Sequence, residues 1–383
     1  MTRGLGMLGR VARIAVFGLM AAGMMALTGC GAFFITPTNS GGGTGGGANG
    51  NVTYVINTVT NTVSGFTVGT GTLANAPGMP FQLGYTPQAE VVTIPNTVLY
   101  VAGPGAIYSY FINSDGSLSV PAAGAAQTII FVLSMDVTPD GNWLIALDGT
   151  TTQLDIYQIN KSTGGLALTS TVPFSIPNTQ VLPKMVKVAP NGQLIFASLG
   201  TGGDLAFTFN TVTGATVLSQ TLAPISTQTS ENGLAIDSTS THLYIARSGL
   251  NGGLAEYTIG TGGTLTPVSG SPFAAGSQPL SVALDPSNTY AYVANGTDAT
   301  ISGYTVGNGV GVPLAGSPFA SGASVRALSL DKTGKYLMAV AFAGAPDLTM
   351  YSIGATVAGG LTQTSTSATG SDPAGAWAVV STH

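Results

Sequence analysis

The chain has 383 residues, of which only 7% are charged, while 55 are glycine and 21 are proline. Fifteen acidic residues outnumber ten basic ones, which gives a formal net charge of −5 and excludes a basic surface suited to the phosphate backbone of nucleic acids. The abundant glycine, proline, threonine, serine and valine favour short strands joined by tight turns over helices.

Residues 1–29 have the three parts of a secretory signal peptide. Three arginines precede the uncharged apolar run 14–27, whose about 14 residues are too few for a membrane-spanning helix, which needs roughly 20. The following Leu27-Thr28-Gly29-Cys30 resembles the bacterial lipoprotein box, which implies cleavage before Cys30 and a lipid on its thiol. Cleavage removes three basic residues, so the mature net charge is 7 − 15 = −8. An uncleaved anchor or a free buried cysteine is the alternative.

The expected location follows from this signal. We expect an exported protein that membrane lipid on Cys30 anchors to a bacterial envelope membrane, facing the periplasm or the cell surface. Cys30 is the only cysteine, so no intramolecular disulfide can form. Residues 30–51 are rich in glycine and lack the apolar content to fold, which predicts a flexible tether.

A repeat of 45 to 51 residues fills the rest of the chain. The motif "TYAYVAN" near residue 292 recurs as "VTYVIN", "VLYVAG", "NWLIALD", "QLIFASL", "HLYIAR" and "KYLMAVA". The central anchor residues are Tyr54, Tyr100, Ile145, Phe196, Tyr244, Tyr292 and Met338. Each copy is followed by two more β-rich runs, and six copies are preceded by a further run that ends in a Pro, Asp, Asn or Gly turn. Four strands per repeat of this length predict a propeller blade.

The strand count also predicts how the ring closes. The first copy has no preceding strand, whereas the C-terminal "PAGAWAVVS" resembles one, with Pro373 aligned with Pro279 and Ala378 with Leu284. The sequence therefore predicts an all-β, seven-bladed propeller over residues 52–383, in which the C-terminal segment is the inner strand of the blade begun by the N-terminal strands. An open solenoid or two separate β domains are the alternatives.

The repeat resembles a known family. "ALDPSNTYAYVANGTDATISGYTV" is similar to the surface-layer YVTN repeat and, with "GLAIDSTSTHLYIARSG", to the bacterial lactonase-type propellers, which include 6-phosphogluconolactonase-like members. The resemblance implies lactone hydrolysis, with Glu231 and Arg247 as candidate catalytic residues. Both histidines of the family's His-Pro-His segment are replaced here, by Leu182 and Lys184, so a carboxylate or lysine would have to act as acid or base.

Candidate binding residues come from the predicted inner strands. Positions aligned with Ala283 are expected to line the central channel, and charged residues before them or at the ends of the next strands are expected at its entrance. The candidates are Asp136, Lys187 and Trp377 along the channel, and Glu90, Lys184, Glu231, Arg326, Asp372, Asp148, Arg247, Asn295 and Asp298 at the entrance. Such a mixed-charge mouth could hold an anionic sugar or peptide carboxylate, or the charges could merely pair and fix the entrance.

Other chemistry is not indicated. The two histidines, His242 in a predicted turn and His383 at position 383, do not suggest a metal site or a catalytic triad, and no motif indicates a cofactor. Three functions remain open: a monomeric envelope binding module for a protein, glycan or small anionic ligand, a lactonase-like hydrolase, and a structural envelope protein. The sequence does not decide whether the protein is an enzyme.

Overall fold

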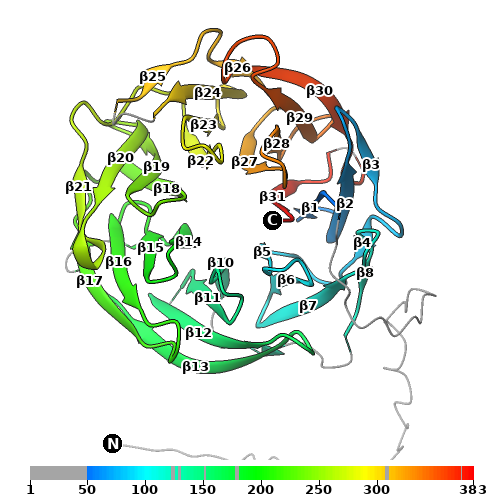
Figure 1. Ribbon diagram of the computed structural model, residues 1–383, viewed down its shortest axis with the longest axis horizontal. Coiled ribbons are helices and arrows are strands. Elements are labelled where there is room, and N and C mark those ends of the chain that lie inside the picture. The colour runs from blue at the N-terminus through cyan, green and yellow to red at the C-terminus, as the bar shows by residue number, and fades with distance from the viewer. Residues whose placement is uncertain are drawn as a thin grey trace, which may run out of the picture. The chain divides into compact units, whose positions relative to one another are not determined.

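The computed structural model describes residues 50–121, 126–127, 131–150, 152–176, 181–306, 310–371 and 373–383. The predicted signal peptide, the lipidation site Cys30, most of the tether and Asp372 lie outside these residues. In the described part the chain forms seven antiparallel sheets arranged as blades around a ring (Figure 1). The predicted all-β, seven-bladed propeller is thereby confirmed.

Each blade has an inner strand against the ring axis and a second strand beside it. The inner strands are β31 (Ala376–Ser381), β5 (Ala89–Val92), β10 (Val132–Val137), β14 (Met185–Val188), β18 (Thr229–Ile236), β22 (Pro279–Leu284) and β27 (Val325–Leu330), for blades 1 to 7 in that order. The second strands are β1 (Val52–Asn57), β6 (Val98–Gly103), β11 (Trp143–Asp148), β15 (Leu194–Ser198), β19 (His242–Gly249), β23 (Tyr290–Asn295) and β28 (Tyr336–Ala341).

The two outer layers complete the blades. The third strands are β2 (Thr62–Val68), β7 (Ala106–Ile112), β12 (Gln153–Asn160), β16 (Asp204–Phe209), β20 (Gly253–Ile259), β24 (Thr300–Thr305) and β29 (Leu348–Ile353). The outer strands are β13 (Gly165–Pro173), β17 (Thr216–Leu222), β21 (Leu265–Pro267) and β30 (Leu361–Ser367), and three blades have two short pieces: β3 (Leu73–Asn75) and β4 (Phe81–Gln82), β8 (Leu118–Ser119) and β9 (Ala126–Gln127), and β25 (Val312–Pro313) and β26 (Phe319–Ala320). One 3₁₀ turn, η1 (Thr261–Gly263), precedes β21.

Blade 1 joins the two ends of the described chain. Strand β31 pairs antiparallel with β1, and its neighbours around the axis are β27 and β5 (Figure 1). Beyond the ladder, the Thr382 amide donates to the Val52 carbonyl at 2.9 Å, and the Val52 amide donates to Thr382 Oγ1 at 3.0 Å. The predicted closure by a C-terminal inner strand is confirmed, and it pairs the inner edge of β1.

The alignment within that strand was wrong by three residues. Val380 faces Tyr54 in the ladder, as Ala283 faces Tyr292. Ala376, rather than Pro373, therefore matches Pro279. The spacing of Pro373 and Ala378 matches that of Pro279 and Leu284, but the pairing with β1 sets the actual register.

Apolar side chains fill the space between neighbouring blades. The described residues form seven buried clusters, and each is built mainly from two adjacent blades. The repeated tyrosines add a polar contact: Tyr54, Tyr100 and Tyr292 are fully buried, and each hydroxyl donates to a glycine carbonyl in the next blade. The repeat residues thus hold blade to blade, because a buried hydroxyl needs a partner.

Candidate functional site

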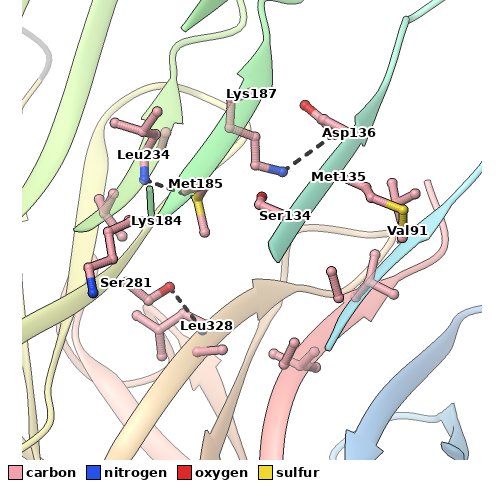
Figure 2. Close-up of a pocket in the computed structure, with 18 of the residues that line it drawn as sticks. Val91, Ser134, Met135, Asp136, Lys184, Met185, Lys187, Leu234, Ser281 and Leu328 are labelled. Carbon is pink, nitrogen blue, oxygen red and sulfur yellow. Dashed lines mark hydrogen bonds and ion pairs between the residues drawn. The ribbon is translucent and has the colours of Figure 1, made fainter. Parts of the chain in front are cut away.

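The seven inner strands surround a cavity of about 650 Å³ on the ring axis. Every blade contributes lining residues. Figure 2 shows this channel, with Lys187 extending toward Asp136 and Lys184 pointing in another direction. A concave, partly polar cavity of this size is where a small ligand binds most readily in such a fold.

One ring of residues lies where the inner strands begin. In each blade, one inner-strand residue faces the anchor residue of the second strand, as Ala283 faces Tyr292 in blade 6. The residue of this ring lies three positions before it in the sequence. The seven residues are Trp377, Gln88, Leu133, Lys184, Asn232, Leu280 and Arg326, in blade order, and all line the cavity. We call this set the mouth ring.

β-Bulges turn several of these side chains toward the channel. The ladder shifts register at Leu133, at Leu280 and at Arg326, and it also shifts at the equivalent points of β18 and β31. A bulge leaves one residue without a partner across the ladder and redirects its side chain, and bulges are frequent beside functional sites. The mouth ring is thus a property of the fold.

The register corrects two predicted positions. Val380 occupies the level of Asp136 and Lys187, so Trp377 belongs to the mouth ring and not to that level. In blade 2, Val91 faces Tyr100 and occupies the channel level. Glu90 then takes the place that Val282 has in blade 6, and it lies away from the entrance. Both positions follow from the pairing with the second strand, which the sequence alone does not give.

Arg326 stacks on Trp377 within the mouth ring. The guanidinium carbon lies 3.2 Å from the centroid of the indole ring, which is a cation–π contact. Phe342 packs edge-on against the same indole, with ring centroids 6.0 Å apart. Burial lowers the pKa of Arg326 to about 10, because desolvation disfavours the charged form. Arg326 forms no ion pair with any residue that the structure describes.

Lys184 is the second cation of the mouth ring. Its side chain runs past Gly200, where an added Cβ would lie only 3.1 Å from Lys184 Cε. Burial, and secondarily the positive charge of Arg326, lowers the pKa of Lys184. Within the described ranges it has no acidic partner. Lys184 and Arg326, from blades 4 and 7, therefore form an uncompensated positive centre.

Asp136, Lys187 and His383 lie deeper in the channel. Asp136 and Lys187 each follow the mouth-ring residue of their strand by three residues, which is about 10 Å along a strand. Lys187 Nζ is 3.5 Å from Asp136 Oδ1, and the Val188 amide donates to Asp136 Oδ2 at 2.8 Å. The ion pair joins blades 3 and 4 and leaves part of Lys187 exposed to the channel. Both residues were predicted as channel lining, and the structure adds that they pair with each other.

His383 lines the same cavity, which the sequence did not suggest. Its amide donates to Asn96 Oδ1 at 2.9 Å, and Asn96 Nδ2 donates to its carbonyl at 3.0 Å. The ring Nε2 lies 3.3 Å from the Val92 carbonyl. Burial lowers the pKa of His383, although the Val92 carbonyl and Asp136 favour the charged form. Correct register for β31 is the signal that would have placed His383 here.

Glu231 and Arg247 meet in a buried ion pair of blade 5. Arg247 Nε donates to Glu231 Oε1 at 2.8 Å and to Oε2 at 3.0 Å, and each side chain is only 3% exposed. Arg247 Nη2 donates to Tyr257 Oη at 2.7 Å. Neither Glu231 nor Arg247 is among the residues that line the channel. The structure therefore joins these two candidates to each other and separates them from Arg326.

A second acid shares this buried cluster. Asp204, from blade 4, is 3% exposed, and burial together with the charge of Glu231 raises its pKa well above the ordinary value. Burial also raises the pKa of Glu231, although Arg247 opposes the shift. One guanidinium cannot balance two buried carboxylates, so the pKa of each acid is shifted toward the protonated form.

The remaining entrance candidates are engaged in loop contacts. Asp148 is fully buried, and its Oδ1 accepts from the amides of Phe131 at 3.2 Å and Thr150 at 2.9 Å. Asp298 Oδ2 accepts from the Ser277 amide at 2.5 Å. Asn295 Nδ2 donates to Ser302 Oγ at 2.9 Å. These contacts stabilise the loops, and ligand binding by these residues stays a prediction.

Glu90 is a buried acid in the wall between blades 1 and 2. Neither of its carboxylate oxygens has a hydrogen-bond partner among the described residues. Burial raises its pKa well above the ordinary value, and the nearby backbone of Ile56 offsets only part of the shift. Burial thus favours the neutral form of the Glu90 carboxyl group.

The described residues contain neither a cluster of metal-ligating side chains nor a membrane-spanning helix. No cluster of three or more histidine, cysteine or acidic side chains suited to a metal ion occurs in the described ranges. No helix there has the length and apolar character to span a membrane.

Known proteins share this fold. No protein-family model matches the sequence, and no curated protein shows significant similarity. Among solved structures, a candidate 6-phosphogluconolactonase of Bacteroides uniformis superposes with a TM-score of 0.72 at 17% identity over 86% of this chain and 99% of the other. Its Bacteroides fragilis counterpart gives 0.71 at 14% identity over 88% and 99%. The periplasmic gluconolactonase of Pseudomonas aeruginosa gives 0.69 at 13% identity over 87% and 99%. These similarities show a shared β-propeller fold.

Proposed function

We propose that this chain is an exported, lipid-anchored binding protein of the bacterial envelope, and that its mouth ring takes a small anionic ligand such as a sugar acid or peptide carboxylate. The observation that carries the proposal is the pair Lys184 and Arg326. Both line the cavity, both have a lowered pKa, and neither has an acidic partner in the described part of the chain.

An anion between these cations would restore favourable charge pairing. Desolvated cations without a counter-ion are unfavourable, and a carboxylate or phosphate oxygen supplies both the charge and the hydrogen-bond acceptors. Each charge-assisted hydrogen bond contributes roughly 1.5–3 kcal/mol. The fixed position of Arg326 on Trp377 lowers the entropy cost of binding, because the guanidinium is already ordered.

The other members of the mouth ring suit a ligand with hydroxyl groups. Gln88 brings a carboxamide whose Oε1 is buried without a hydrogen-bond donor among the described residues, whereas the amide of Asn232 is held by Ser248 and the Pro279 carbonyl. A ligand hydroxyl can donate to Gln88 Oε1. Leu133 and Leu280 supply apolar walls on the remaining sides.

Titration calorimetry on the purified full-length chain tests the site, with gluconate, acetate and inorganic phosphate as probes. We expect Arg326→Met and Lys184→Met each to weaken gluconate binding by roughly tenfold or more, since one charged contact of 1.5–3 kcal/mol is lost. Lys335→Met, at an exposed turn, is the matched control. Binding that all three variants leave unchanged would refute the mouth ring as the site.

Hydrolysis of a sugar or other small lactone is the alternative function. The lactonase names of the structural neighbours favour it, and so does His383, which brings to the channel an imidazole able to accept or donate a proton. A lactone panel with Glu231→Gln, Arg247→Ala and His383→Gln distinguishes the sites. Loss of hydrolysis only in His383→Gln would place the reaction in the channel, whereas activity in none of the proteins would favour binding or a structural envelope role.

The anchor is tested separately. Cys30→Ser removes the thiol that would carry the lipid, so we expect the protein to leave the membrane fraction. Continued membrane association of this variant would contradict lipidation as the only anchor.

A further inference from the structure

Three exposed apolar side chains lie next to the mouth ring. They are Phe131, Leu182 and Phe342, which are 41%, 41% and 37% exposed. Phe131 and Leu182 each precede a mouth-ring residue by two positions, and Phe342 packs edge-on against Trp377. Each inner strand begins beside the end of the second strand of its blade, so these three loop residues lie on one face of the ring. We call them the apolar collar.

The backbone of the apolar collar is fixed although its side chains are exposed. Each of the three amides donates a hydrogen bond, at 3.2, 3.0 and 3.1 Å, to an acceptor in its own blade. The acceptors are Asp148 Oδ1, the Leu199 carbonyl and the Ser324 carbonyl, in chain order of the donors. Apolar side chains grouped on one exposed face are typical of an interaction site. An ordered backbone lowers the entropy cost of binding there.

Arg326 adds a positive charge beside the apolar collar. Its guanidinium carbon lies 3.2 Å from the centroid of the Trp377 ring, which Phe342 also contacts, so a cation and a collar residue share one indole. Arg326 lines the cavity and forms no ion pair with a described residue. Stacking uses the face of the guanidinium and leaves the N–H donors at its edge for a carboxylate. An acid bound there would place the chain attached to its carboxylate near the collar.

Gln88 supplies a hydrogen-bond acceptor in the next blade. It follows Trp377 in the mouth ring, and its buried Oε1 has no donor among the described residues. Either a sugar hydroxyl or a peptide N–H can donate to this oxygen. The collar favours the peptide, because a sugar acid has no apolar side chains to bury against it, whereas a peptide carries both amides and side chains.

We propose that the mouth ring and the apolar collar together bind the C-terminus of a peptide or protein that ends in apolar residues. The terminal carboxylate binds Arg326, an amide N–H donates to Gln88 Oε1, and the apolar side chains pack on the collar. This inference rests on the proposed function, because the carboxylate takes the anion position of the mouth ring. It narrows the ligand from two classes of acid to one.

Titration calorimetry with synthetic peptides on the full-length chain tests the inference. The probes are an N-acetylated tetrapeptide that ends in Leu-Phe with a free carboxylate, its C-terminal amide, and a free-acid peptide that ends in Ser-Ser. We expect the apolar free acid to bind on the order of tenfold more tightly than each of the others, since each lacks one of the two contacts. Equal affinity of the acid and its amide, or of the apolar and the polar peptide, would overturn the proposal.

Variants assign each contact to its residues. Arg326→Met should weaken binding of the apolar free acid on the order of tenfold and leave binding of the amide unchanged. The double variant Phe131→Ser/Leu182→Ser should weaken the apolar peptide by roughly threefold or more and leave the Ser-Ser peptide unchanged. Leu168→Ser/Leu218→Ser is the matched control, because these exposed leucines lie on the outer strands β13 and β17. An equal loss of affinity in the two double variants would refute the collar as the docking surface.

The outcomes also distinguish this inference from the proposed function. If gluconate binds more tightly than the apolar peptide and loses affinity in Arg326→Met, the peptide is refuted while the anion site stands. The same holds if acetate binds as tightly as the apolar peptide and depends on Arg326. If none of the peptides, gluconate, acetate and phosphate binds, both fail.

Discussion

Replacement of Arg247 by methionine tests the buried cluster of blade 5. The change removes three hydrogen bonds, two to Glu231 and one to Tyr257, while the methionine side chain can fill part of the apolar volume. Because Glu231 and Asp204 are both about 97% buried, water cannot replace the lost guanidinium. Breaking a buried ion pair by removing one partner costs about 3–5 kcal/mol, which is a large part of the 5–15 kcal/mol that a domain typically has.

The cost should depend on pH with a definite sign. The folded-state pKa values of Asp204 and Glu231 are raised. Their contribution to the free energy of unfolding is therefore fully present below the pKa of the unfolded chain. It is lost as the pH rises through the folded-state pKa values. Removal of Arg247 raises the pKa of Glu231 further. The variant should therefore be closest to wild type near pH 5 and furthest from it near pH 8.

Urea unfolding followed by tryptophan fluorescence and circular dichroism at both pH values measures the effect. The double variant Arg247→Met/Glu231→Leu removes both charges, so we expect it to recover much of the stability lost at pH 8. A loss of less than about 1 kcal/mol for Arg247→Met at pH 8 would refute the reasoning. So would a double variant that is no more stable than the single one.

Three further predictions concern the ring. Glu90→Gln should stabilise the protein at pH 8 and change it little at pH 5, because the wild-type carboxyl must ionise in a buried site; urea midpoints that shift equally at both pH values would contradict this. Tyr292→Phe should cost about 1–3 kcal/mol, since the Gly359 carbonyl loses its 2.7 Å donor, while Tyr108→Phe is the control on a half-buried ring. Deletion of residues 372–383 should destabilise the protein far more than a surface trim, because it removes β31 from the ring; a thermal midpoint equal to that of the full chain would exclude this closure.

The fold could be predicted because its information is local and repeated. Seven copies of an anchor such as Tyr292, each beside turn residues, determine the strand order and the number of blades. The closing strand could be found by counting. Its register could not, because the spacing of Pro373 and Ala378 matched another copy by chance, whereas the ladder with β1 places Val380 opposite Tyr54.

The candidate site depended on the tertiary structure. Charged residues of the inner strands could be identified in the sequence, but their partners could not. Glu231 turned out to be paired with Arg247 inside blade 5, while Lys184 and Arg326 lack acidic partners among the described residues. Pairing depends on the strand register and on where neighbouring strands and blades meet, and the repeat pattern carries no local signal for that.

The sequence by itself therefore determined a seven-bladed ring built from one repeated unit, whereas export stays a prediction from the signal sequence. Only the tertiary structure decided the levels of the channel, because a β-bulge or a register shift of a few residues moves a side chain from the blade interface to the channel. It brought His383 to the channel lining, stacked Arg326 on Trp377, and left Lys184 without an acidic partner among the described residues.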